Sequence, residues 1–324
     1  MIGSWMPFLT CPASGAATMG ALAPWAAAAA LAGIGSVAVL LVAARTARAQ
    51  RDAEGGLARY VAILAARDGA PDFARRTLAH RESFFASLDS SPLAARAPID
   101  RATFLRNLAR ARPERGLDER ALFLLATAKS NVSERYGVEL AERLGRMHAG
   151  REPVLVHVTL QEHYHTRMLA DVVRAFGLPV PDVRPPLAAR AVVHAILALP
   201  ERLGLPLTGA SEMAGCILFR MLRDRGREIF ADEPAVAARI ALLYDEILID
   251  EIGHVGLIAW QLGRVGRAAM RFLYRAVARF MLRAMPEMRT LVGDAAIARA
   301  TRGAFPLDDL LRDLGGRAFA LARP

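Results

Sequence analysis

Residues 245–254 read DEILIDEIGH, a stretch in which Glu251 and His254 stand three positions apart. Residues 162–165 read EHYH and place Glu162 and His165 at the same spacing. Side chains three positions apart lie on one face of an α-helix, so each pair can offer a carboxylate oxygen and an imidazole nitrogen to one metal ion. One such pair would mean little by itself, and the surrounding sequence has to show whether the two act together.

The sequence around both motifs has a helical pattern. Beyond residue 50, apolar residues recur at every third or fourth position and no segment alternates with a period of two. Proline and glycine separate these apolar segments. The pattern predicts an all-α body with helices near 53–67, 72–88, 99–112, 117–147, 153–176, 188–199, 207–228, 234–263, 266–284, 287–301 and 307–321.

Four of the predicted helices are long, and they occur in two pairs. A short break joins 117–147 to 153–176 and another joins 207–228 to 234–263, while a longer stretch with one small helix links the pairs. Two antiparallel hairpins joined by a crossover are one arrangement of a four-helix bundle. The two E-x-x-H motifs fall on the second and fourth long helices, where bundle geometry brings them face to face.

The first and third long helices each offer a further glutamate. Glu212 is the only acidic residue of its helix before Asp224, and its helical neighbours are small or apolar. An unpaired carboxylate among such neighbours is costly. In the first helix Glu134 lies on an uncharged stripe, whereas Glu139 has arginines four residues away on both sides, as in a solvent-exposed ion pair. We therefore choose Glu134, with Glu139 as the alternative.

Four other side chains are candidates for supporting roles. Asp250 can accept a hydrogen bond from His165 across the bundle and fix that imidazole, although a surface aspartate is the simpler interpretation. His157, five residues before the first motif, is a candidate for a similar outer role. Tyr244 lies two helical turns before the second motif. Together with Phe219, it is a candidate wall of a substrate pocket.

The pattern E, E-x-x-H, E, D-E-x-x-H on four helices resembles the ferritin-like di-iron carboxylate superfamily, which includes rubrerythrins, acyl-carrier-protein desaturases and aminobenzoate N-oxygenases. The resemblance covers about residues 117–263. It implies two iron ions, or iron with manganese, because carboxylates and imidazoles suit these metals. The implied ligands are Glu134, Glu162, His165, Glu212, Glu251 and His254, and the implied bridging carboxylates include Glu162 and either Glu212 or Glu251.

The chain departs from known members of this superfamily at three places. The small subunit of ribonucleotide reductase stores a radical on a tyrosine about one turn beyond the first histidine, where this chain has residues 167–169, RML. The N-oxygenases add a histidine one turn before the second motif, where this chain has Ile247. The arginine usual before the final histidine is Gly253, which predicts free space beside the metals. The first departure argues against a ribonucleotide reductase, whereas the second counts against N-oxygenation without excluding it. The substrate stays undefined.

The resemblance implies an oxidoreductase that activates dioxygen. The expected reaction is oxygenation, hydroxylation, N-oxidation or desaturation of a small or lipophilic substrate, with an electron-donor protein as partner and a homodimer as a compatible assembly. A ferritin- or rubrerythrin-like protein that handles iron or scavenges oxidants is the first alternative. A metal-free helical scaffold is the second.

The composition restricts the partners and the compartment. The formal net charge is +10, and Lys129 is the only lysine among 42 basic residues. The arginines are scattered at helical spacing without an aromatic- or glycine-interleaved basic run, so no nucleic-acid partner is expected. The two cysteines, Cys11 and Cys216, form no CxxC pair, which favours a reducing compartment.

The N-terminal residues predict a membrane anchor. Residues 1–44 contain no charged side chain, and residues 25–44 are apolar over a length that can span a bilayer. Arg45, Arg48 and Arg51 follow, and the positive-inside rule then places the body in the cytoplasm. We expect a single-pass protein of the inner membrane with a cytoplasmic catalytic body. The alternatives are a signal peptide cleaved near residues 47–49 and a misassigned start codon, which would give a soluble cytoplasmic protein.

The expected fold is therefore a ferritin-like four-helix bundle with extra N- and C-terminal helices and an N-terminal transmembrane segment. In the C-terminal helices, Phe272 and Phe280 alternate with arginines. This stripe favours packing on neighbouring helices, with contact to anionic lipid as its rival. The expected segments are the anchor with its basic flank (1–50), a helical extension (51–116), the di-iron bundle (117–263) and amphipathic helices (264–324).

Overall fold

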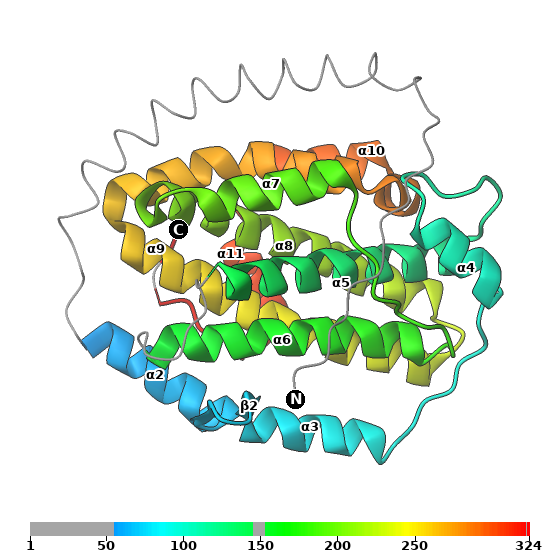
Figure 1. The fold of residues 1–324 in the computed structure, drawn as a ribbon, viewed down its shortest axis with the longest axis horizontal. Helices are drawn as coiled ribbons and strands as arrows, with labels where there is room; N and C mark the ends of the chain where they lie inside the picture. The colour runs from blue at the N-terminus through cyan, green and yellow to red at the C-terminus, as the bar shows by residue number, and fades with distance from the viewer. Residues whose placement is uncertain (1–54, 145–152, 322) are drawn as a thin grey trace, which may run out of the picture.

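The computed structural model describes residues 55–144, 153–321 and 323–324. This part of the chain forms ten helices and one two-stranded hairpin, which confirms the all-α class (Figure 1). No helix among the described residues is long and apolar enough to cross a membrane. The predicted anchor lies outside the described residues.

Four long helices form the centre of the molecule: α5 (Glu119–Arg143), α6 (Pro153–Arg174), α8 (Glu201–Ile229) and α9 (Pro234–Ala284). Asp118 caps α5 by accepting a hydrogen bond from the Ala121 backbone N–H. Prolines begin α6 and α9, where a missing backbone N–H costs nothing. Helix α8 lies along α9, α5 lies along α6, and α6 also contacts α9.

Glycines allow these helices to approach closely. A Cβ on Gly226 of α8 would overlap Ile240 of α9, and one on Gly209 would overlap Met270. Side chains such as Phe123 and Met168 are completely buried between the helices. One continuous apolar cluster runs from Leu78 to Ala318, so the helices at 79–89, 101–108, 286–302 and 307–313 share the core of the four long ones. Tyr60 and Leu64 belong to a second, smaller cluster with Val154 and Leu257.

One break and one start of the long helices can be compared with the prediction. The backbone leaves the helical conformation at Gly263, with φ 62° and ψ −170°, which confirms the predicted break after residue 263. Glycine accepts this positive φ without strain. Helix α8, by contrast, begins at Glu201 and continues through Pro206, so the predicted start at residue 207 is wrong. Pro206 lies close to the start of the helix, where its ring interrupts only one backbone hydrogen bond.

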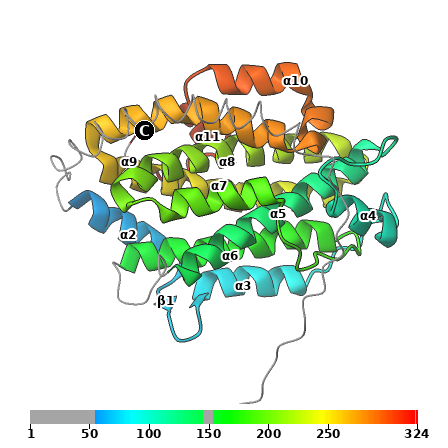
Figure 2. The same cartoon turned by 45° about the horizontal axis from the view of Figure 1, so that its top comes forward.

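The shorter helices surround this centre. They are α2 (Gly55–Asp68), α3 (Ala79–Asp89), α4 (Arg101–Leu108), α7 (Leu187–Ala198), α10 (Pro286–Arg302) and α11 (Leu307–Asp313). Figures 1 and 2 both show α2 and α3 along the side of the molecule formed by α6, with α10 on the opposite side. The N-terminal extension therefore borders the helix that carries the first motif.

Three predicted helices are clearly shorter than expected. The helix expected over 99–112 spans only Arg101–Leu108. The helix expected over 72–88 begins at Ala79, because strands β1 (Pro71–Asp72) and β2 (Thr77–Leu78) form a small antiparallel hairpin before it. The helix expected over 307–321 ends at Asp313. Gly315 and Gly316 follow with φ values of 61° and 75°, a conformation that terminates helices.

Candidate metal centre

The six residues chosen from the sequence come together inside the molecule. Each of the four long helices contributes at least one of them, and each E-x-x-H motif presents its glutamate and histidine on one helix face. The six form two overlapping groups in which one candidate ligand atom per residue lies within 4.8 Å of all the others. The groups are Glu134, Glu162, His165 and Glu251, and Glu162, Glu212, Glu251 and His254.

The Nδ1 atoms of the two imidazoles face the carboxylates. His165 Nδ1 lies 3.5 Å from Glu162 Oε2 and 3.4 Å from Glu251 Oε1. His254 Nδ1 lies 2.9 Å from Glu162 Oε1 and 3.8 Å from Glu212 Oε2. Both Nδ1 atoms are buried, and neither makes a hydrogen bond within the described part of the chain. Buried nitrogen atoms without a partner are costly, and a metal ion between them and the carboxylates would satisfy both.

The opposite nitrogen of each imidazole is held by a hydrogen bond. His165 Nε2 lies 3.1 Å from Asp250 Oδ2, the contact expected from the sequence. His254 Nε2 lies 3.0 Å from Gln161 Oε1, and the Gln161 amide donates in turn to Asp250 Oδ1 at 3.1 Å. With Nε2 as the N–H donor in both rings, Nδ1 is left as the electron-pair donor that a metal requires.

Residues of the N-terminal extension complete this network. Arg81 Nη2 donates to Asp250 Oδ2 at 2.8 Å, and Arg67 also pairs with Asp250. Arg67 and Gln161 both contact the carboxylate of Asp68, each at 2.8 Å or less. Burial alone would raise the pKa of Asp250, but the charges of Arg81 and Arg67 hold it well below its usual value. Asp250 is therefore a buried anion beside His165.

Three other sequence expectations have different outcomes. His157 Nε2 donates a hydrogen bond to the Asp68 carboxylate at 3.1 Å, so it joins the same network at its outer edge. Tyr244 is buried and its hydroxyl lies 2.8 Å from Thr127 Oγ1, with the ring of Phe219 beside it. The role of Tyr244 and Phe219 in a substrate pocket stays a prediction.

The expected free space at Gly253 is absent. A Cβ on this residue would collide with the hydroxyl of Tyr60, which belongs to α2. The space beside Gly253 is therefore occupied by the phenol of Tyr60, from the N-terminal extension. The prediction failed because the sequence gives no indication of which distant segment packs against a helical glycine.

The carboxylates of the cluster interact strongly with one another. Burial and the nearby Glu162 carboxylate raise the pKa of Glu134 to about 8, although the neighbouring His165 imidazole lowers it. Burial and the charge of Glu212 raise the pKa of Glu251 well above its usual value. Burial lowers the pKa of both histidines, but the surrounding carboxylates together outweigh it and raise the pKa well above its usual value. These carboxylates are Glu162, Asp250 and Glu134 for His165, and Glu162 and Glu212 for His254. The cluster thus favours additional positive charge.

The cluster is closed on one side and open on the other. The side chains of His165 and Glu251 are 0% and 3% exposed, whereas those of Glu134 and Glu212 are 22% and 21% exposed. The closed side faces the network of α2 and α3. The partly exposed carboxylates therefore lie on the side formed by α5, α6 and α8.

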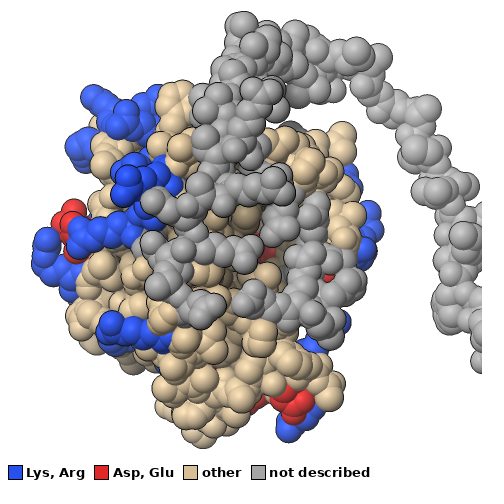
Figure 3. Space-filling model, turned by 90° about the vertical axis from the view of Figure 1, so that its left-hand side faces the viewer, with Lys and Arg blue, Asp and Glu red and all other residues tan. Residues whose placement is uncertain are grey.

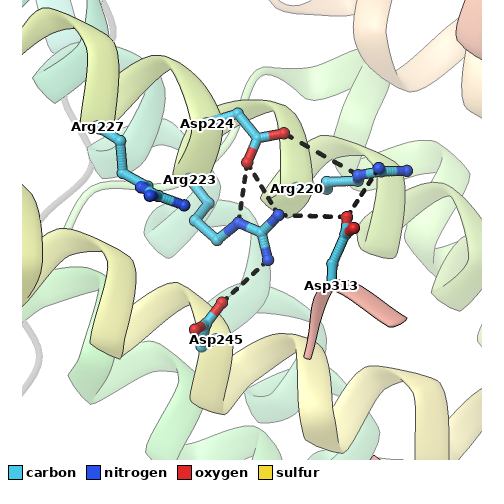
Figure 4. Close-up of a pocket in the computed structure, with 6 residues that line it drawn as sticks. All are labelled: Arg220, Arg223, Asp224, Arg227, Asp245 and Asp313. Atoms are coloured by element: carbon cyan, nitrogen blue, oxygen red, sulfur yellow. Dashed lines mark hydrogen bonds and ion pairs between the residues drawn. The ribbon is translucent and has the colours of Figure 1, made fainter. Parts of the chain in front are cut away.

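A polar pocket lies elsewhere on the molecule, and Figure 4 shows its lining residues. Arg223 lies 3.0 Å from Asp245, and Arg220 lies 2.7 Å from Asp313, so the pocket joins α8, α9 and α11. Three arginines face three aspartates, and their charges compensate one another. The lining residues are Arg220, Arg223, Asp224, Arg227, Asp245 and Asp313, none of them a candidate ligand.

Comparison with protein-family models, with curated proteins and with solved structures gave no match to this chain. The class of protein is therefore defined by its own residues. It is an all-helical protein with a buried cluster of glutamates and histidines that could hold metal ions.

Proposed function

We propose that the chain is a ferritin-like di-iron carboxylate protein that activates dioxygen to oxidise a small or lipophilic substrate. The observation that carries this proposal is the pair of overlapping groups, in which Glu162 and Glu251 are shared and each group has its own histidine with a free Nδ1 atom. A buried helical scaffold would pair such carboxylates with arginines, but the arginines here pair with Asp68 and Asp250 behind the cluster.

The donor set fits two divalent ions of iron, or of iron and manganese. Four carboxylates balance four positive charges, and oxygen and imidazole ligands suit these metals. Glu134 and His165 would hold one ion, Glu212 and His254 the other, and Glu162 and Glu251 both. When bound, iron supplies the electrons and the binding position for dioxygen.

The residues around the ligands have separate tasks. Asp250 and Gln161 orient the two imidazoles through their Nε2 atoms, and Arg67 and Arg81 keep Asp250 ionised. The buried network also excludes water from the α2 and α3 side. The partly exposed carboxylates of Glu134, Glu162 and Glu212 then define the side on which substrate and dioxygen approach.

Metal analysis tests the metal centre first. The chain is reconstituted with Fe(II) without oxygen, desalted and analysed, and we expect close to two irons per chain. A folded protein, as judged by its helical circular dichroism, that retains no metal would contradict the proposal.

Oxygen consumption tests the enzymatic part. The reduced protein is mixed with dioxygen and with candidate amines, phenols or acyl compounds, and products are analysed by mass spectrometry with isotopically labelled dioxygen. We expect one chemical class to accelerate oxygen consumption and to become oxidised. If no compound does so and the chain instead accumulates many irons in a large assembly, the iron-handling function replaces the enzymatic one.

A further inference from the structure

The second half of α9, residues 264–284, exposes large apolar side chains on the outside of the molecule. Phe272 is 64% exposed, Phe280 48% and Val265 38%. Figures 1 and 2 show this half, in orange, running along the outer side of the molecule after the bend at Gly263. Large apolar side chains in water are unfavourable, and several of them exposed on one helix indicate a contact surface.

Arginines without acidic partners lie beside these apolar residues. Arg264, Arg271, Arg275 and Arg279 are all exposed, and within the described ranges none of the four forms an ion pair. The sequence contains no acidic residue from position 252 to position 286. Some other surface arginines are paired, as Arg120 is with Glu233 at 2.6 Å. Figure 3 looks onto the end of the molecule where α9 turns back, and Lys and Arg gather along one edge of it with few Asp or Glu beside them.

The helical repeat arranges the two kinds of residue in adjacent stripes. At about 100° per residue, the four arginines fall within one narrow arc of the helix circumference. Val265, Phe272, Ala276 and Phe280 fall in the next arc, and all of them are exposed. At about 1.5 Å per residue the two stripes run side by side for roughly 24 Å. We call this surface, residues 264–280 of α9, the basic–apolar face.

We propose that the basic–apolar face binds an anionic lipid surface. Phenylalanine rings can enter the boundary between headgroups and acyl chains, while arginines extend their aliphatic stems and bring the guanidinium groups to the lipid phosphates. Helix α9 would then lie flat on the membrane, parallel to its surface. The proposal is independent of the metal centre, because none of the six candidate ligands lies in this half of the helix.

Charge complementarity favours lipid over the other occupants. A second copy of the chain would place arginines against arginines with no acidic residue to compensate them. Residues 1–44 of the chain are uncharged, and Arg45, Arg48 and Arg51 follow them, so this segment cannot neutralise the face either. A nucleic acid would match the arginines but would leave the continuous apolar stripe in water.

Vesicle flotation with the full chain tests the proposal. Vesicles of phosphatidylcholine alone are compared with vesicles that also contain phosphatidylglycerol. The triple variant Arg271→Glu, Arg275→Glu, Arg279→Glu should bind the anionic vesicles at least about tenfold more weakly. Each basic residue near an anionic membrane adds about 1 kcal/mol to the free energy of binding, and the variant loses three of them. Phe272→Ser with Phe280→Ser should weaken binding to both kinds of vesicle.

A matched control separates this face from the overall charge. Arg101, Arg112 and Arg115 are also exposed and lie in or near α4, so replacing all three by glutamate gives the same net charge. This control should bind anionic vesicles within about twofold of the unmodified chain. Equal losses in both triple variants, or no loss in the α9 variant, would overturn the proposal. So would a labelled oligonucleotide whose binding depends on the same arginines while vesicle binding does not.

Discussion

At the level of single residues, Glu162 and Glu251 differ from the other candidate ligands because they belong to both groups. Glu134→Ala and Glu212→Ala should therefore each leave about one iron per chain, whereas Glu162→Ala should remove nearly all of it, because both ions lose a shared ligand. Metal analysis after desalting measures this difference.

Glu139→Ala is the control for that series, because the Glu139 side chain is 50% exposed and faces Arg135. The unmodified metal content is expected in this variant. A loss of iron in Glu139→Ala with full occupancy in Glu134→Ala would show that the wrong glutamate of α5 has been chosen.

The contact between Gly253 and Tyr60 gives a second residue-level prediction. Gly253→Ala should lower the free energy of unfolding by about 1–3 kcal/mol, because its methyl group overlaps the Tyr60 hydroxyl. Tyr60→Phe removes the overlapping oxygen, so Gly253→Ala should cost clearly less in that background. Urea denaturation of the four proteins gives the coupling energy. A coupling of zero would show that the two side chains do not meet.

Some residues of the site could be predicted from the sequence, and others could not. The E-x-x-H spacing indicates four ligands directly, and Glu134 and Glu212 follow from the absence of charges beside them. Asp68, Arg67 and Arg81 had no such signal, because they come from a distant extension and act through tertiary contacts. Gln161 could have been found, since it immediately precedes the first motif and its amide can both accept from a histidine and donate to a carboxylate.

At the level of elements, α6 and α9 are connected through Gln161. Gln161→Leu leaves the Nε2 atom of His254 without its acceptor, and we expect metal affinity to fall by about 10- to 100-fold. Competition with a chelator of known affinity measures the change. Gln261→Leu, a half-buried glutamine on α9, is the matched control and should leave the affinity unchanged. Equal affinities for the two variants would contradict a positioning role.

The attachment of α2 to the bundle should depend on pH through Asp68. Burial raises the pKa of Asp68, but hydrogen bonds to His157 and Arg67 outweigh it and lower the pKa to about 2. A lowered pKa stabilises the fold above the pKa of the unfolded carboxyl, about 4, and this stability is lost as the pH falls towards 2.

The difference in unfolding free energy between the unmodified chain and Asp68→Asn should therefore shrink by up to about 2 kcal/mol as the pH falls from about 4 to about 2. Chemical denaturation at several pH values measures it. Asp182→Asn changes a side chain that is 89% exposed and should have little effect at any pH. A difference for Asp68→Asn that does not vary with pH would contradict the assignment.

The elements themselves were predictable to different degrees. The apolar period and the prolines gave the long helices, and Gly263 marked the break in α9. The hairpin of Pro71–Asp72 and Thr77–Leu78 was missed, because two-residue strands are too short to show a period. The path of α8 through Pro206 was missed because a proline near a helix start reads in sequence like a helix boundary.

At the level of the whole molecule, the candidate ligands come from four helices that are distant in sequence but share one core. A metal ion that binds only the folded chain stabilises it by mass action, by about 2.7 kcal/mol at a free concentration 100 times the dissociation constant. The stabilisation should extend over all four helices, because every one of them supplies a ligand. It should also be large, because the ions offset the burial and the carboxylate repulsion that together raise the pKa values of Glu134 and Glu251.

We therefore predict that Fe(II) or Mn(II), added without oxygen, raises the melting temperature of the chain and slows hydrogen exchange in α5, α6, α8 and α9 together. Protection confined to one helix would indicate a local site instead of a shared centre. Glu162→Ala provides the matched negative case, because it removes a ligand common to both groups. If the metal raised the melting temperature of Glu162→Ala as much as that of the unmodified chain, the ions would be binding elsewhere on the molecule and the six residues would not form the metal centre.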